Sequence, residues 1–360
     1  MLDAFAISHE ESPLPKARIS AVSYFLPEHI RTIGDIETKI KENSSTKDNL
    51  PFGLISRITG VQQVHVMPDD WQTSDLAVAA INAMREEHGQ AVTDEIDLLI
   101  FASASQDMIE PATSHIVASK SGIKAPVMDV KNACNSMMNG IEVANAFIRS
   151  GAYRRVLVVS GECPSRGIRW NIPDKKTYMS SFPGFTMSDA GAAVLVESTH
   201  IPQMSRTIGT PQAEIIGAGF SADSDSWDVG MLPTGGSYYP RGYDRTYFEI
   251  DGGRLFEAFA VLGPKILDDT IAKLGFCWDD FAMIGIHQVA LPYLDTVREK
   301  LGIPTDKTVI TLDKRGNIAS CSLPLQLKTA MDSGMVKPGD TVALVGLAGG
   351  ISIGVMIVRM

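Results

Sequence analysis

Two segments of the chain follow the same plan, and this repeat limits the fold more than any other feature. They span residues 127–162 and 309–350. Each opens with a short apolar strand, turns through small and polar residues, runs as an amphipathic helix to a Ser-Gly pair, and returns as a strand rich in Val and Leu. A further apolar strand precedes each copy, within residues 94–105 and 279–290. The repeat predicts a βαβ unit made twice.

The strands of this unit predict the fold class. Runs such as LLIF, RVLVV and TVALVGL are apolar on both faces, which is typical of strands covered by helices on either side of a parallel or mixed sheet. We therefore expect an α/β protein with an N-terminal extension at 1–16 and two similar halves at 17–205 and 206–360. The seam should lie near residues 200–215. Residues 164–185 and 221–248 are rich in Gly, Pro, Tyr and Ser and should form long loops near a functional site.

Composition excludes several classes of function. The chain has 360 residues and a net charge of -10, whereas nucleic-acid binding requires a clustered basic surface. No apolar run is long enough to span a bilayer, and the acidic, mixed N-terminus is unlike a signal peptide, so we expect a cytoplasmic protein. The four cysteines are scattered without ligand spacing, which predicts neither disulfides nor a metal site, and no motif implies a cofactor.

Cys134 is the candidate nucleophile. It lies where the strand VMDV passes into a helix, so its sulfur should sit at a helix N-terminus. The helix dipole there would stabilise a thiolate and lower the pKa below its usual value of about 8.5. A small buried cysteine is the simpler alternative.

His287 and Asn317 occupy matching places in the second copy. His287 ends the strand MIGIH, and Asn317 lies in RGNIASC, at the strand-to-helix corner that corresponds to the corner of Cys134. Taken singly, they could be a core histidine and a helix cap. If a pseudo-twofold axis joins the corners, a thiolate, an imidazole and an amide face one cavity, as acyl transfer through a covalent thioester requires. The glycine-rich stretch 347–352 could aim a backbone N–H at the oxyanion, or form a tight turn.

These residues and their order resemble the thiolase superfamily, and most closely its β-ketoacyl-ACP synthase III branch. The segments that carry the resemblance are DVKNAC, FTMSDAGAAVLVE, IGIHQ, LDKRGNIAS and KPGDTVALVGLAGGISIG. The resemblance implies a thiolase fold with a duplicated αβαβα architecture and a homodimer.

The resemblance also implies a set of site residues. Cys134, His287 and Asn317 would form the catalytic triad, the N–H groups of Cys134 and Gly349 would form the oxyanion hole, and Leu347 would contact substrate. The substrates would be acyl thioesters of CoA or of an acyl carrier protein.

Three positions depart from the housekeeping pattern of that family. Arg57 matches the arginine that meets the CoA nucleotide, but Gly53 replaces the aromatic residue expected beside it. Pro292 replaces a basic residue that helps to dock the carrier protein. Glu110 stands in the loop that the family inserts into the partner subunit's acyl pocket, as in the branch that condenses two long acyl chains, where such a Glu acts as base. A solvated loop residue is the alternative for Glu110.

The leading hypothesis is a Claisen-condensing enzyme of specialised lipid or natural-product biosynthesis. The alternatives are an acyltransferase that passes the Cys134 acyl group to a hydroxyl or amine, and a non-catalytic partner subunit. Degradative thiolases use a second cysteine in the C-terminal glycine-rich loop, and the loop at 347–354 contains none.

Overall fold

A computed structural model describes residues 14–45, 50–201, 213–242 and 245–360. Its main feature is a nine-stranded sheet with the order β11-β12-β13-β8-β1-β7-β6-β4-β5. The strands are β1 (Ala17–Phe25), β4 (Leu98–Ala102), β5 (Val127–Val130), β6 (Arg155–Glu162), β7 (Ala190–Ser198), β8 (Ala213–Ala222), β11 (Met283–Ile286), β12 (Thr341–Ala348) and β13 (Ser352–Arg359). β4 pairs in parallel with β5 and β6, and β11 with β12, whereas the other neighbours are antiparallel, so the sheet is mixed.

The sheet consists of two halves that meet where β1 pairs with β8, at Arg18↔Glu214 and Ile19↔Ala213. The first half contains β1 and β4 to β7, and the second contains β8 and β11 to β13. The predicted boundary at residue 205 and most of the expected seam lie outside the described residues. β1 begins at Ala17, but residues 1–13 are not described, so the extension over residues 1–16 stays a prediction.

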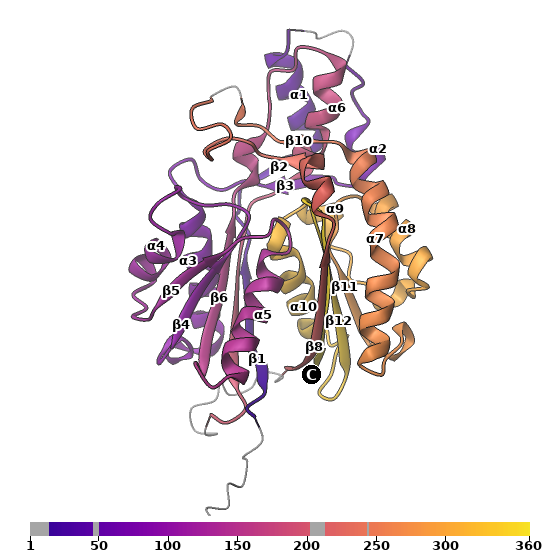
Figure 1. Cartoon of the computed structure of the whole chain (residues 1–360). Coiled ribbons are helices and arrows are strands. Elements are labelled where there is room, and N and C mark those ends of the chain that lie inside the picture. The colour runs from indigo at the N-terminus through magenta and orange to yellow at the C-terminus, as the bar shows by residue number, and fades with distance from the viewer. Residues whose placement is uncertain (1–13, 46–49, 202–212, 243–244) are drawn as a thin grey trace, which may run out of the picture.

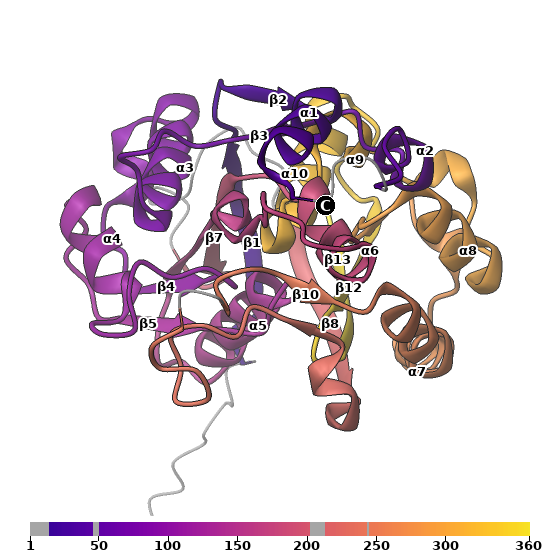
Figure 2. The ribbon, with the colours of Figure 1, turned by 90° about the horizontal axis from the view of Figure 1, so that it is seen from above.

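Helices cover the two halves in layers (Figures 1 and 2). The helices α3 (Thr73–His88) and α4 (Thr113–Ser121) pack on the outer face of the first half, and α7 (Gly252–Lys273) and α8 (Leu291–Leu301) on that of the second. Between the halves lie α5 (Ser136–Arg149) and α10 (Ser322–Asp332), whose apolar side chains share one core with both halves. Ile141, Ala144 and Ile148 illustrate the helical spacing that buries α5. The arrangement is the predicted αβαβα fold.

A cap closes one end of these layers, at the top of Figure 1. It contains α1 (Ile33–Asn43), α2 (Ile55–Thr59), α6 (Lys175–Ser181) and the strand pairs β2 (Ile30–Thr32) with β3 (Gln63–His65) and β9 (Gly230–Met231) with β10 (Glu249–Ile250). The expectation of a plain loop at 164–185 is therefore wrong. This segment forms α6 and buries Tyr178, Phe182 and Phe185 against α1 and α2, because its aromatic residues supply a core of their own.

The repeat is confirmed except at one place. β5, α5 and β6 form as predicted, and so do α10 and β12, but residues 309–311 form no strand and lead into the single turn α9 (Leu312–Arg315). The side chain of Gln288 takes the backbone groups that a strand would have paired. Its Nε2 donates to the carbonyl of Val309 at 2.6 Å, and its Oε1 accepts from the N–H of Thr311 and Leu312.

No helix in the described part of the chain has the length and apolarity to cross a membrane.

Candidate active site

Cys134 lies in a tight turn between β5 and α5. Ala133, immediately before it, has a φ of 45°, a left-handed conformation that is uncommon for a residue other than glycine. The hydroxyl of Ser136 donates to the carbonyl of Ala133 at 2.7 Å, which fixes the turn. This turn holds Cys134 two residues before the first residue of α5, close to the helix N-terminus as the sequence predicts.

The second copy repeats this geometry before α10. Ala319 has a φ of 48°, and the hydroxyl of Ser322 donates to its carbonyl at 2.7 Å. By this match Ser320 is the counterpart of Cys134, and Asn317 lies two residues before Ala319. The two corners are thus related as predicted, and the turn geometry adds the residue-by-residue alignment.

Hydrogen bonds between the copies connect the corner of Cys134 to the β12–β13 hairpin. The side-chain amides of Asn132 and Asn135 both donate to Ser352, the first residue of β13, at distances of 3.0 to 3.1 Å. α5 also contacts the short turn Ala319–Cys321 that follows Asn317. Gly349 lies in the turn of the same hairpin, and these bonds join the strand that follows it to the residues on either side of Cys134.

His287 follows β11, and its N–H donates to the carbonyl of Val345 in β12. Its Nδ1 lies 3.1 Å from Ser322 Oγ. Because the Ser322 hydroxyl donates its proton to Ala319, the network assigns the hydrogen to Nδ1 of His287 and leaves Nε2 with a free lone pair. Nε2 has no partner in the described part of the chain, and burial lowers the pKa of His287 to about 4. The side chain is therefore a neutral base at neutral pH.

Asn317 is held by its backbone and by its side-chain oxygen. Its N–H donates to Thr186, its carbonyl accepts from Ser188, and its Oδ1 accepts from the N–H of Ala319 at 3.0 Å. The NH₂ group has no acceptor among the described residues, although the residue is buried. The arrangement leaves an amide donor available to a ligand at this corner.

The expected low pKa of Cys134 is wrong in this structure. Burial of the thiol and the nearby carboxyl of Glu162 raise its pKa to about 12, and its own backbone N–H lowers it only in part. The helix dipole is too weak to reverse this, because Cys134 precedes Asn135, the N-cap of α5, and the dipole acts mainly within the first turn. The resting pair is a neutral thiol and a neutral imidazole.

Apart from the contact of the Cys134 N–H with its own thiol, the N–H groups of Cys134 and Gly349 donate to no acceptor in the described residues. Free backbone donors at a nucleophile are what stabilisation of an oxyanion requires. The same described residues contain no group of three His, Cys, Asp or Glu side chains that could hold a metal ion.

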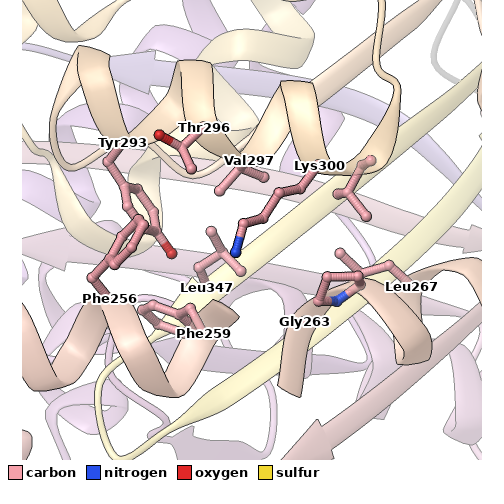
Figure 3. A pocket seen from close by; sticks show the side chains of 11 residues that line it. Phe256, Phe259, Gly263, Leu267, Tyr293, Thr296, Val297, Lys300 and Leu347 are labelled. Carbon is pink, nitrogen blue, oxygen red and sulfur yellow. The ribbon is translucent and has the colours of Figure 1, made fainter. Parts of the chain in front are cut away.

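Leu347 faces away from the corner of Cys134. A Cβ on its neighbour Gly346 would lie 2.1 Å from Asn135 Oδ1, so Gly346 faces the central layer, and side chains alternate along a strand. Leu347 points to the outer layer and lines an apolar pocket between α7 and α8 (Figure 3). The hydroxyl of Tyr293, in the same pocket, is buried without a partner in the described chain.

The remaining predicted residues lie at the surface or at helix ends. Arg57 is exposed on α2. Gly53 has a φ of 76°, which explains why no aromatic side chain stands there. Pro292 occupies the first turn of α8, where a proline is well tolerated. Glu110 is exposed beside Met108 and Ile109, so within a single chain it is not enclosed in an apolar pocket.

Two buried residues of the site were missed in the sequence. Ser322 orients His287, and Glu162 lies at the end of β6 with a side chain that is 1% exposed. The available signal was the acidic residue that ends the otherwise apolar strand RVLVVSGE, because a carboxylate is rarely buried without a reason.

Comparison with known proteins finds matches in one family. Residues 128–211 match the family model of 3-oxoacyl-[acyl-carrier-protein (ACP)] synthase III, and residues 271–360 match its C-terminal model. The β-ketoacyl-[acyl-carrier-protein] synthase III of Neisseria meningitidis serogroup B is 29% identical over 345 residues, covering 95% of this chain and 99% of the relative. That of Fusobacterium nucleatum is 28% identical over 348 residues, covering 95% and 98%.

Solved structures show the same fold. The synthase III of Thermus thermophilus superposes with a TM-score of 0.79 at 25% identity, covering 95% of this chain and 98% of the other. Xanthomonas campestris OleA, solved with lauric acid and lauroyl-CoA bound, superposes with a TM-score of 0.84 at 22% identity, covering 96% and 100%. With its thiolase fold and both family models matched, the chain belongs to the β-ketoacyl-[acyl-carrier-protein] synthase III family of the thiolase superfamily.

Proposed function

We propose that this ketosynthase III-like protein loads an acyl group onto Cys134 and joins it to a second acyl thioester by Claisen condensation. The observation that carries the proposal is the set of groups left without partners at the two corners. They are the neutral Nε2 of His287, the NH₂ of Asn317 and the N–H groups of Cys134 and Gly349. Together they would supply one base and several donors for reaction at the Cys134 thiol.

Acylation uses the base. As the Cys134 sulfur attacks the thioester carbonyl, its proton passes to Nε2 of His287, and the oxyanion accepts from the N–H groups of Cys134 and Gly349. The tetrahedral intermediate collapses with loss of the carrier thiolate, which takes a proton from solvent and departs as a thiol, while His287 keeps the proton of Cys134. A raised thiol pKa suits this order, because the thiol then loses its proton only when a base and an electrophile are both in place.

Condensation uses the donors. The second thioester becomes an enolate whose oxygen accepts from Asn317 and from the His287 ring, which protonation has made a donor at both nitrogens. The α-carbon attacks the Cys134 acyl carbonyl, a carbon–carbon bond forms, and the Cys134 thiolate leaves and regains a proton. We propose fatty acyl thioesters as the substrate class, supported by the lauric acid and lauroyl-CoA in the similar OleA structure.

We further propose that Glu110 removes the α-proton in a homodimer. β5 is the edge strand of the sheet, and its Val127, Met128 and Val130 are only half-buried. The neighbouring loop exposes Met108 and Ile109 at 49% and 69%. An apolar edge of this kind favours pairing with a second copy, which would enclose the loop and Glu110.

Intact-mass spectrometry tests the proposal directly. The protein is incubated with acyl-CoA thioesters of increasing chain length and with acyl carrier protein thioesters, alongside Cys134→Ala and Glu110→Gln, and condensed products are extracted. We expect a mass increase of one acyl group that Cys134→Ala abolishes. Glu110→Gln should keep that increase and lose the product.

Each other outcome has a definite meaning. Acylation without product in the native protein, but with transfer to an added alcohol or amine, would identify an acyltransferase. No acylation from any thioester would exclude catalysis through Cys134 and leave the partner-subunit alternative.

A further inference from the structure

We propose that Glu162 is a positioning residue of the condensing centre, which holds the turn between Asn317 and Ser322 against the half of the molecule that carries Cys134. Its catalytic consequences rest on the proposed function, whereas its effect on the Cys134 thiol does not. Glu162 touches no reacting atom of the proposed mechanism, and it acts through the residues that do.

The carboxyl of Glu162 accepts four hydrogen bonds from two other segments of the chain. Oε1 accepts from the N–H of Ala104 at 2.9 Å and from the hydroxyl of Ser320 at 2.5 Å. Oε2 accepts from the N–H and the hydroxyl of Ser105, at 3.2 and 3.0 Å. The Ser105 hydroxyl accepts in turn from the N–H of Cys163, so it must donate to Glu162. The carboxyl therefore joins the end of β6, the segment after β4 and the turn of the second copy.

The repeat shows that this connection is specific to one half. β6 and β12 are equivalent strands of eight residues, so Glu162 is the counterpart of Ala348. Likewise Ser320, which donates a hydrogen bond to Glu162, is the counterpart of Cys134. At the end of β6, the carboxyl of Glu162 bonds to the turn of the second copy. At the equivalent end of β12, Ala348 has no polar side-chain group that could bond to Cys134.

The bond to Ser320 reaches the catalytic groups through a short, stiff segment. Ser320 lies between Ala319, which fixes the side chain of Asn317, and Ser322, which fixes the tautomer of His287. Because Ala319 already has a left-handed φ, this turn requires support from its surroundings. Loss of the Ser320 contact should let the turn relax and misplace both donors of the condensation step.

The charge of Glu162 acts on the nucleophile as well. No Lys, Arg or His nitrogen in the described chain forms an ion pair with it. Its field raises the pKa of Cys134, and it acts in the same sense on Cys163 after β6 and Cys321 in the turn. Burial raises the pKa of Glu162 itself, while its hydrogen bonds from Ser320, Ala104 and Ser105 lower it in part.

Glu162→Gln and Ser320→Ala separate charge from contact. Glutamine is nearly isosteric with glutamate, but its amide has one acceptor oxygen and one NH₂ group. The NH₂ group takes the place of one carboxylate oxygen and so points at hydrogen-bond donors, with which it cannot bond. Ser320→Ala removes the hydrogen bonds of this hydroxyl with Glu162 and with Ser160, and keeps the carboxyl. Both are made in a Cys277→Ser background, because Cys277 is the exposed thiol among the four cysteines and would react first. Alkylation of Cys134 by iodoacetamide is followed between pH 7 and 10, together with acylation and condensation rates.

We expect Glu162→Gln to alkylate about threefold faster or more at pH 8, because removal of a nearby negative charge lowers the thiol pKa. Ser320→Ala should alkylate like the background protein. Both variants should condense about tenfold more slowly, a change of about 1.4 kcal/mol, which is the size expected when buried hydrogen bonds that hold the turn are lost.

Two results would overturn the proposal. One is an alkylation profile of Glu162→Gln that overlays that of the background protein, and the other is a condensation rate of Ser320→Ala equal to that of the background. If Glu162→Gln does not fold, Ser320→Ala alone still decides whether the turn needs this contact. If no thioester acylates the native protein, the proposed function fails while the alkylation profiles still test the action of Glu162 on Cys134.

Discussion

His287 should make the unfolding free energy fall as the pH falls between its unfolded and its folded pKa, because burial lowers the pKa of the folded side chain. Its pKa is lowered from 6.5 to about 4, so between these values the unfolded chain binds a proton that the folded chain does not. Stability contributed by this group is therefore present above pH 6.5 and is lost as the pH falls toward 4. His287→Gln removes the titration and keeps a donor for Ser322.

The size of the effect follows from the two pKa values. For one group with these values, the linkage relation gives a loss of about 2 kcal/mol in unfolding free energy between pH 7 and pH 4.5. The native protein should lose this amount in addition to whatever His287→Gln loses over the same interval. The two proteins can differ in unfolding free energy by a constant amount for other reasons. Only a change in that difference between pH 7 and pH 4.5 reports the protonation of His287.

Urea unfolding at pH 7 and pH 4.5, at one fixed protein concentration, measures that difference through tryptophan fluorescence. If the difference between native protein and His287→Gln is the same at both pH values, His287 is not a buried neutral imidazole. The tautomer argument and the assignment of His287 as the base for acylation would then both fail.

Two further predictions concern the groups that hold the site. Ser322→Ala removes the hydrogen-bond partner of His287 Nδ1 and should lower the acylation rate about tenfold. Intact-mass spectrometry of samples quenched at successive times measures that rate, and the far-UV circular dichroism should not change. Gly161→Ala should lower the melting temperature by several degrees, because a Cβ there would lie 1.9 Å from the carbonyl oxygen of Thr73, and overpacking costs about 1 to 3 kcal/mol. Gly252→Ala, with no atom within 4 Å of its Cβ, is the control and should melt like the native protein.

Much of the architecture could be predicted because its signals are local. The strand-to-helix corners and the helix ends are encoded by residues a few positions apart, and the glycines that end α5 and α10, Gly151 and Gly334, have the positive φ that a helix stop requires. The relation between the two corners followed from the repeat alone. These features need no knowledge of the rest of the chain.

The parts that could not be predicted depend on contacts between distant residues. Gln288 replaces a strand at 309–311 through hydrogen bonds across more than 20 positions. Glu162 reaches Ser320 across 158 positions, and only this contact shows that it belongs to the site. The orientation of Leu347 depends on which face of β12 meets the central layer, which the apolar pattern of that strand leaves open because both faces are buried.

The pKa of Cys134 shows why local reasoning reversed the sign of an effect. A helix N-terminus favours a thiolate, but the tertiary structure adds desolvation and the field of Glu162, and both favour the thiol. A thiol of high pKa is the stronger nucleophile once its proton is removed, since intrinsic nucleophilicity falls with pKa. A neutral His287 with a free Nε2 is the group that can remove it. In such a site the thiolate would form during acylation, when the proton can pass to His287 as the sulfur attacks, which makes the position of the imidazole, and the turn that fixes it, more important than the helix dipole.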